Sequence, residues 1–137
     1  ISRGAASAET VIQICSTLLK KLGIWQADDH IYICPHYPES GFEGEVVELK
    51  IHCGCRKPNP ALLLQAANDH SFRLTNAIMI GDSHADVIAA LHVGARVIHL
   101  HTDLEGICKI DSPLGKLVSC ILFVDIQTKL VEMIGQS

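Results

Sequence analysis

The side chains best suited to chemistry are soft metal ligands gathered in one stretch. Cys34 and His36 form a C-x-H pair, and Cys53 and Cys55 form a C-x-C pair after 16 intervening residues. Three thiolates and one imidazole are the donor set of a closed, tetrahedral structural zinc site. The surrounding loop is polar and rich in proline and glycine, so it offers no apolar core for cysteines. We predict that these four residues bind zinc.

Two alternatives to this ligand set remain open. His52 could supply the imidazole in place of His36, although it breaks the paired spacing. The cysteines could also be buried thiols of an intracellular protein that bind no metal, beside a surface histidine. The remaining cysteines stand in apolar or isolated settings and are expected in the core: Cys15, Cys108 and Cys120.

Two cations follow the second pair directly. Arg56 offers a planar guanidinium for bidentate recognition of phosphate or carboxylate, and Lys57 offers a compact charge for a phosphoryl oxygen. Neighbouring exposed cations are usually only solvated. Here a metal-bound backbone would fix their direction, because the pair follows Cys55 directly. We predict that Arg56 and Lys57 face an anionic substrate.

Residues 81–86 follow an apolar run; their sequence is GDSHAD, which contains two carboxylates. A carboxylate at the end of a buried strand is placed where Mg²⁺ binds one or two carboxylates, waters and a substrate phosphate. Asp82 is therefore a predicted magnesium ligand, and Ser83 is expected to cap the helix that follows. In the alternative interpretation Asp82 only begins that helix and Asp86 is a solvated charge.

The elements that would position these residues alternate between helix and strand. This alternation predicts an α/β domain with a doubly wound, mainly parallel sheet, whose ligands bind at the C-terminal strand ends. The expected helices are 8–22, 60–69, 84–93 and 125–134; the expected strands are 30–34, 77–80, 96–100 and 120–124, with a further extended piece at 46–51 and a loop at 102–114.

Length and composition set the broad class. With 137 residues, 48% hydrophobic and 4% aromatic, the chain can form a single domain, 1–137, with an aliphatic core and a zinc-binding loop at 34–55. A net charge of -4 does not favour nucleic acid as a partner. No apolar run is long enough to cross a membrane, and no signal sequence opens the chain. We expect a cytoplasmic monomer.

Taken in order, these segments resemble the haloacid dehalogenase superfamily of phosphatases. They are most similar to its zinc-containing branch of D-glycero-D-manno-heptose 1,7-bisphosphate phosphatases and histidinol-phosphate phosphatases. The segments are CPHYP at 34–38, CGCRKPNP at 53–60 and MIGDSHAD at 79–86, and ISRG at 1–4 looks like the I-x-R-G that follows the family's second motif. The resemblance spans essentially the whole chain and implies a haloacid dehalogenase-like Rossmannoid fold.

The resemblance implies a role for each candidate. The two cysteine-containing pairs would bind structural zinc, Arg56 would help recognise substrate, Lys57 would stabilise the transferring phosphoryl group, and Asp82 would coordinate Mg²⁺. Ser83 stands where the family often has a basic residue. Family members begin with a strand ending in D-x-D-G-[TV], whose first Asp attacks phosphorus, and no D-x-D occurs in these 137 residues. We expect the N-terminal strands and this nucleophile in a segment outside the sequence.

The resulting hypothesis is a Mg²⁺-dependent phosphatase that acts on a small phosphorylated metabolite through an aspartyl-phosphate. The long loop between the zinc pairs and the R-K-P-N-P segment resemble the heptose branch, so D-glycero-D-manno-heptose 1,7-bisphosphate is the expected substrate. Histidinol phosphate is the alternative within the family. A competing class is a non-catalytic, zinc-stapled module that binds an anion or a partner chain.

Overall fold

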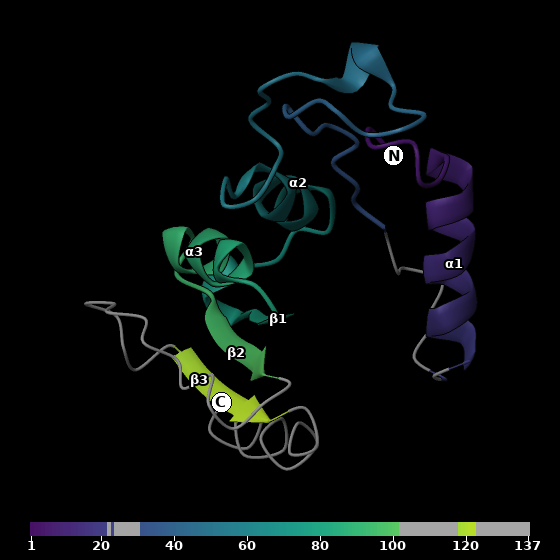
Figure 1. Ribbon diagram of the computed structural model, residues 1–137. Helices are drawn as coiled ribbons and strands as arrows, with labels where there is room; N and C mark the ends of the chain where they lie inside the picture. The colour runs from purple at the N-terminus through teal and green to yellow at the C-terminus, as the bar shows by residue number, and fades with distance from the viewer. Residues whose placement is uncertain (22, 24–30, 102–117, 123–137) are drawn as a thin grey trace. The chain divides into compact units, whose positions relative to one another are not determined.

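The computed structural model describes residues 1–21, 23, 31–101 and 118–122 (Figure 1). The chain divides into two compact units, which we call the N-terminal unit (Ile1–Arg56) and the C-terminal unit (Lys57–Ser137). The expected loop at 102–114 and the expected last helix at 125–134 lie outside the described residues. The single-domain organisation stays a prediction.

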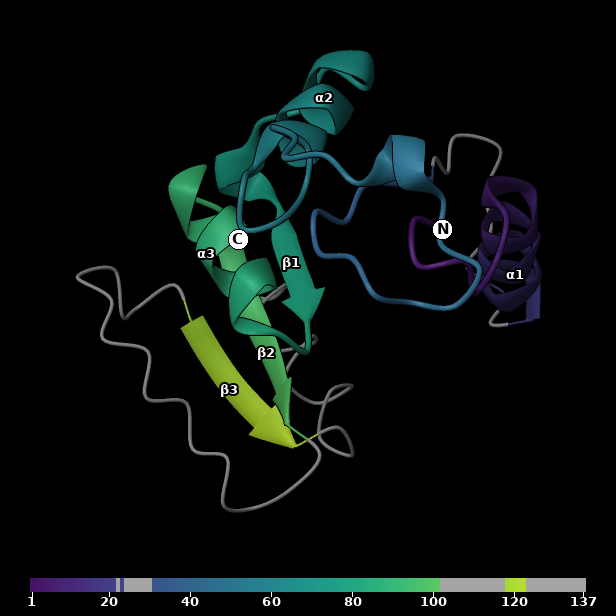
Figure 2. The same cartoon turned by 45° about the horizontal axis from the view of Figure 1, so that its top comes forward.

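A parallel sheet forms the framework of the C-terminal unit. Its strands are β1 (Ile78–Gly81), β2 (Arg96–His101) and β3 (Val118–Leu122), in the order β1-β2-β3 (Figure 2). Both strand pairs are parallel, and Gly81 lies opposite His99 at the end of β1. The expected parallel α/β arrangement is therefore confirmed. Two strands are shifted along the chain from their expected ranges: β1 by one residue and β3 by two.

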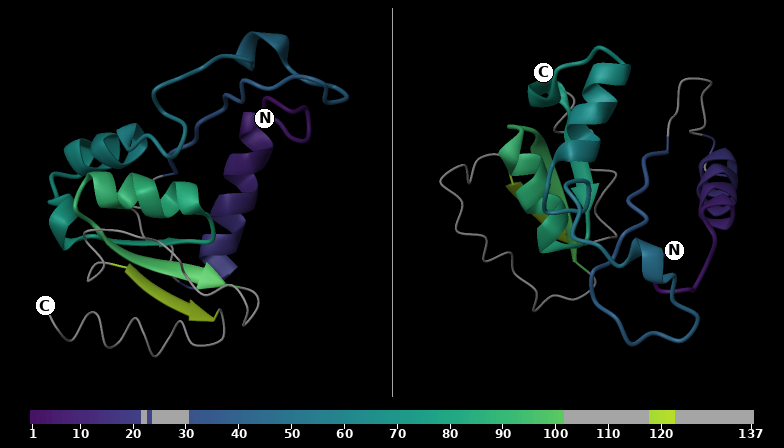
Figure 3. Two further views of the ribbon diagram at one scale, coloured as in Figure 1. Left: turned by 60° about the vertical axis from the view of Figure 1, so that its left-hand side comes forward. Right: turned by 90° about the horizontal axis from the view of Figure 1, so that it is seen from above.

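Helices α2 (Ala61–Asp69) and α3 (His84–His92) belong to the same unit. Helix α3 packs against β1 and β2 and lies along one face of the strands (Figure 3). This contact builds a small aliphatic core, in which the following residues are buried: Val87, Ala90, Ala95 and Val97. Because α3 follows β1 after a short turn, the core holds residues 81–86 in place at the carboxyl end of the strand.

Local hydrogen bonds set where these helices begin. The Ser83 hydroxyl accepts a bond from the Asp86 N–H at 3.3 Å, and the Asp86 carboxylate accepts one from the Ser83 N–H at 3.2 Å, so the two residues form a capping box. The predicted Ser83 cap is confirmed. The Asn59 carboxamide accepts a bond from Ala61 N–H at 3.2 Å, although Pro60 is the N-cap residue and α2 begins one residue later than expected.

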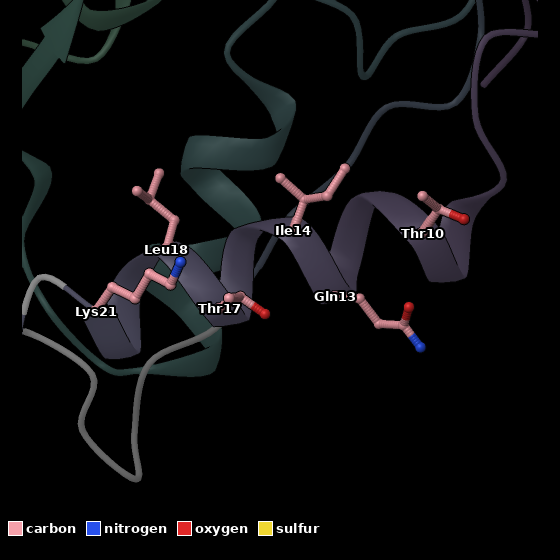
Figure 4. A pocket seen from close by; sticks show the side chains of 6 residues that line it. All are labelled: Thr10, Gln13, Ile14, Thr17, Leu18 and Lys21. Atoms are coloured by element: carbon pink, nitrogen blue, oxygen red, sulfur yellow. The ribbon is translucent and has the colours of Figure 1, made fainter.

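Helix α1 (Ala8–Lys21) of the N-terminal unit confirms the expected helix, and residue 22 lies outside the described part. The apolar residues of α1 form one stripe, a pattern that predicts a packing helix, but that prediction is wrong because no residue of α1 is buried. Ile14 and Leu18 remain 60% and 54% exposed and line a shallow hollow on the helix surface (Figure 4). A helical apolar period shows that a face can pack, but it supplies no partner for that face.

Two further expectations fail in this unit. Residues 31–34 form no strand, and residue 30 is not described. The expected extended piece at 46–51 contains a 3₁₀ helix, η1 (Val47–Leu49). β-branched residues favour a strand only where another strand can pair with them, and no described strand pairs with either run. Pro35, which has no N–H to donate, adds to this effect.

The opening segment Ile1–Gly4 instead organises the loop that carries the cysteines. Ser2 is 2% exposed, and its N–H donates to Pro35 O at 3.2 Å while its carbonyl accepts from Val46 N–H at 3.1 Å. The Ser2 hydroxyl donates to Leu49 O at 3.2 Å. Residue 2 therefore joins the two sides of the loop between residues 35 and 49.

We expect Gly81→Ala to destabilise the C-terminal unit. A Cβ at this position would lie 2.6 Å from Asp86 Cγ and 2.7 Å from its Oδ2, so α3 would have to move away from β1. Overpacking of this kind costs about 1 to 3 kcal/mol, which chemical denaturation can measure. Gly54→Ala is the control, since no atom lies within 4 Å of its added Cβ. Equal denaturation midpoints for both variants would contradict this expectation.

Among the described residues, no helix is long and apolar enough to cross a membrane.

Candidate functional site

The four predicted zinc ligands lie together in the N-terminal unit. The Sγ atom of Cys55 lies 3.2 Å from that of Cys34 and 3.4 Å from that of Cys53, and 3.5 Å separates Cys34 from Cys53. His36 Nδ1 is 3.5 Å from Cys55 Sγ and 3.8 Å from Cys34 Sγ. All four ligand atoms lie within 4.8 Å of one another, whereas His52 is exposed and outside the cluster.

This geometry fits a tetrahedral ion. Ligands about 2.0 to 2.3 Å from zinc lie roughly 3.3 to 3.8 Å from one another in a tetrahedron, close to the separations observed here. The four side chains are half-buried, and Cys34, Cys53 and Cys55 are free of disulfides. The cluster could therefore hold a metal ion, with His36 in place of the alternative His52.

The close approach of the thiols shifts the pKa values of Cys53 and Cys55 in opposite directions. Burial raises the pKa of Cys53, but hydrogen bonds from Cys55 and Cys34 outweigh it and lower the pKa to about 6. The hydrogen bond to Cys34, together with burial and the bond to Cys53, raises the pKa of Cys55 to about 12. One thiol thus ionises readily while another keeps its proton, so an ion bound by all three must displace protons.

Arg56 is held against the loop that carries the candidate metal ligands. Its Nη1 donates to the carbonyl of His36 at 3.1 Å, and its guanidinium carbon lies 4.4 Å from the centre of the Tyr37 ring. The side chain is nevertheless exposed. The contacts with His36 and Tyr37 give the Arg56 side chain a defined direction, and the expectation that a metal-bound backbone fixes it stays a prediction.

Lys57 belongs to the C-terminal unit and pairs with Asp86. Its ammonium group donates to the Asp86 carboxylate, in a pair whose side chains are 49% and 5% exposed respectively. The Ser83 hydroxyl donates to the other Asp86 oxygen at 2.7 Å. Asp86 is therefore not the solvated charge of the alternative interpretation, but a buried anchor for Lys57.

Asp82 follows β1 directly and is exposed. Within the described ranges its carboxylate makes no hydrogen bond or ion pair, in contrast to that of Asp86. Hard carboxylate oxygens at the carboxyl end of a parallel strand suit Mg²⁺, which takes one or two carboxylates and completes its shell with water and phosphate. The donor chemistry of Asp82 fits this ion.

Comparisons with known proteins agree with this arrangement. A family model described as HAD-hydrolase-like matches residues 54–113. A D-glycero-beta-D-manno-heptose-1,7-bisphosphate 7-phosphatase of Yersinia pestis is 36% identical over 101 residues, which cover 72% of this chain and 52% of that protein. The chain belongs to the haloacid dehalogenase-like hydrolase family.

Other relatives of this haloacid dehalogenase-like chain carry the same name. The protein of Helicobacter pylori strain J99 is 42% identical over 76 residues, or 56% of this chain and 36% of its own length. The protein of Escherichia coli K12 is 39% identical over 72 residues, or 51% of this chain and 36% of its own length. The chain thus spans about half the length of the Yersinia relative and about a third of the other two.

Asp86 is the site residue that sequence reasoning did not assign. Two signals could have identified it: its position four residues after Asp82, and the Ser-x-x-Asp pattern that it shares with Ser83. The pairing with Lys57 has no such signal, because 29 positions separate the two residues.

The Asp86 carboxylate should make stability depend on pH. Burial raises its pKa, but hydrogen bonds from Lys57 and Ser83 outweigh this effect and hold the pKa below its usual value. Since the folded pKa lies below the unfolded value of about 3.9, the contribution is present above that value and is lost as the pH falls through the folded pKa. Asp86→Asn should therefore destabilise the protein strongly at pH 7 and less at pH 3.

Unfolding midpoints at the two pH values test this expectation. Asp82→Asn is the matched control, because it removes a nearby carboxylate without removing the Lys57 contact. An Asp86→Asn penalty of the same size at both pH values would contradict the assignment.

Proposed function

We propose that this chain is part of a Mg²⁺-dependent phosphatase that hydrolyses a phosphate monoester of a small sugar metabolite, D-glycero-D-manno-heptose 1,7-bisphosphate. The observation that carries the proposal is the pairing of Lys57 with Asp86. Asp86 is buried and lies in the first turn of α3, the helix that follows Asp82. The names of the relatives support the substrate class.

Lys57 would act on the phosphoryl group. Phosphoryl transfer depends chiefly on positioning and on charge stabilisation, and a preorganised cation is most effective where negative charge develops. Asp86 holds the ammonium group from one side, and the remaining half of the Lys57 side chain is open to solvent. The Lys57 ammonium group would therefore contact the phosphoryl oxygens without a prior loss of side-chain freedom, because Asp86 already holds it.

Asp82 would hold Mg²⁺ through its exposed carboxylate. The ion would supply positive charge to the substrate phosphate. Ser83 is uncharged and contributes no cation where the family often has one, and its hydroxyl and N–H are both bonded to Asp86. In this chain Lys57 and Arg56 would supply the cationic side chains for the substrate.

Zinc would serve as a scaffold in this proposal. Bound by Cys34, His36, Cys53 and Cys55, it would close the loop whose last residue precedes Arg56. Arg56 would then recognise an anionic group of the substrate. We further propose that the protein works as a monomer in the cytoplasm.

Phosphate release from the full-length protein tests the function. The protein is loaded with zinc and assayed with Mg²⁺ on the heptose bisphosphate and, separately, on histidinol phosphate. Release of phosphate from the heptose bisphosphate supports the proposal. Release only from histidinol phosphate would show that histidinol phosphate, and not the heptose bisphosphate, is the substrate. Absence of release from either, at one zinc per chain, would favour the non-catalytic, anion-binding module instead.

A further inference from the structure

The ring of Tyr37 is surrounded by cations of the N-terminal unit. The guanidinium carbon of Arg56 lies 4.4 Å from the ring centre, that of Arg3 lies 5.1 Å away, and the Lys50 ammonium lies 5.8 Å away. Cations within about 6 Å of an aromatic centre are attracted by the negative face of the ring. The N-terminal segment and the stretch that contains Lys50 and Arg56 thus converge on one aromatic side chain.

Tyr37 is itself held firmly. Its N–H donates to Leu49 O at 3.2 Å, its carbonyl accepts from the Ser2 hydroxyl at 3.4 Å, and its own hydroxyl donates to Glu39 at 2.8 Å. The ring meets that of Phe42 edge-on at 5.7 Å. The ring is therefore a fixed platform for the cations that contact it.

The three cations differ in what else they contact. Lys50 is paired with Glu45 at 3.0 Å and donates to Glu39 O at 2.7 Å, and its side chain is 8% exposed. Arg3 and Arg56 are exposed, and no carboxylate in the described part of the chain pairs with either. The charge of Lys50 is thus already compensated, whereas two guanidinium groups beside one ring remain available to an anion.

We propose that Tyr37 is a positioning residue that holds the Arg56 guanidinium, with Arg3 beside it, in the orientation that binds an anionic group of the substrate. This inference rests on the proposed role of Arg56 in recognising a phosphorylated sugar. Arg56 has one backbone anchor, the carbonyl of His36, and the Tyr37 ring supplies the second contact. The guanidinium contacts the face of the ring, so the positioning role does not require the Tyr37 hydroxyl.

Matched substitutions separate the ring from the hydroxyl. Tyr37→Phe keeps the ring, whereas Tyr37→Leu removes it and keeps an apolar side chain. With the heptose bisphosphate, Tyr37→Leu should raise KM by roughly two- to fivefold, the size of one exposed cation–π contact, and leave kcat nearly unchanged. Tyr37→Phe should behave as the wild type. Phe72→Leu, an exposed aromatic residue of the other unit, is the control.

A double-mutant cycle shows whether Tyr37 acts through Arg56. In an Arg56→Ala background the ring has no guanidinium to hold at that position, so Tyr37→Leu should have little further effect on KM. Zinc content is measured for every variant to show that the loop is intact. An unchanged KM for Tyr37→Leu, or an equal rise in both backgrounds, would overturn the proposal.

Binding of inorganic phosphate provides a readout that does not need turnover. In proton NMR spectra, the Arg56 side-chain signals should be shifted by the Tyr37 ring current, and this shift should persist in Tyr37→Phe and vanish in Tyr37→Leu. Phosphate should bind Tyr37→Leu roughly two- to fivefold more weakly. If these results hold in a protein without phosphatase activity, only the proposed function fails. If the shift is absent in the wild type, the positioning role fails.

Discussion

Replacing Lys57 with alanine is expected to lower kcat by about 10²- to 10³-fold, the usual loss when a preorganised group that stabilises transition-state charge is removed. KM should change far less, because the charge of Lys57 is most useful as negative charge grows on the phosphoryl oxygens. Steady-state kinetics of the full-length protein with a sugar phosphate and Mg²⁺ provide the measurement.

Two further variants serve as comparisons for the kcat of Lys57→Ala. Lys21→Ala removes a lysine from the last turn of α1 and should leave kcat unchanged. Asp86→Asn keeps Lys57 but weakens its anchor, so it should lower kcat by less than the Lys57 substitution does. A kcat for Lys57→Ala equal to that of the wild type would remove Lys57 from the proposed mechanism.

The C-terminal unit was predicted well because its signals are local. The apolar run before Gly81, the Ser83 cap and the glycine after α3 are each encoded within a few residues. Gly94, for example, ends the helix with φ at +70°, a conformation that glycine adopts without strain. Periodicity and capping together therefore predicted the type of each strand and α-helix that the structure describes in this unit, with boundary errors of one or two residues.

The gathering of the three thiols and the imidazole was also predictable, for a chemical reason rather than a conformational one. Thiols and imidazoles in a polar loop have few structural uses, so the C-x-H and C-x-C pairs predict a common site without knowledge of the chain path. The choice between His36 and His52 followed from the paired spacing, and the structure places His36 with the cysteines.

The features that could not be predicted depend on tertiary contacts. Residues 31–34 have strand-forming side chains but no described strand pairs with them, and no part of the chain that the structure describes buries the apolar stripe of α1. From the sequence alone Asp86 is interpreted as a surface charge, because its pairing with Lys57 is visible only in the structure. The contacts of Tyr37 with Arg3 and Arg56 join positions separated by many residues, so no spacing rule reveals them.

Removal of zinc is expected to have the largest effect on stability, and Cys53→Ser is the substitution that tests it. The N-terminal unit has few buried side chains among its described residues, so a metal would replace a core as the main support of the loop. Structural zinc contributes an apparent binding free energy of about 10 to 16 kcal/mol in small zinc-binding peptides. Loss of one thiolate should therefore lower zinc content well below one ion per chain and unfold the loop.

Cys15→Ser is the matched control, because Cys15 lies in α1 and outside the cluster. It should keep one zinc per chain and the wild-type thermal midpoint, whereas Cys53→Ser should resemble the chelator-treated wild type in both. Because Arg56 is anchored on the backbone of His36, loss of zinc should also weaken phosphate binding. Freshly purified, reduced wild-type protein that contains no zinc, or a Cys53→Ser variant as stable as Cys15→Ser, would show that the loop is held together without a metal.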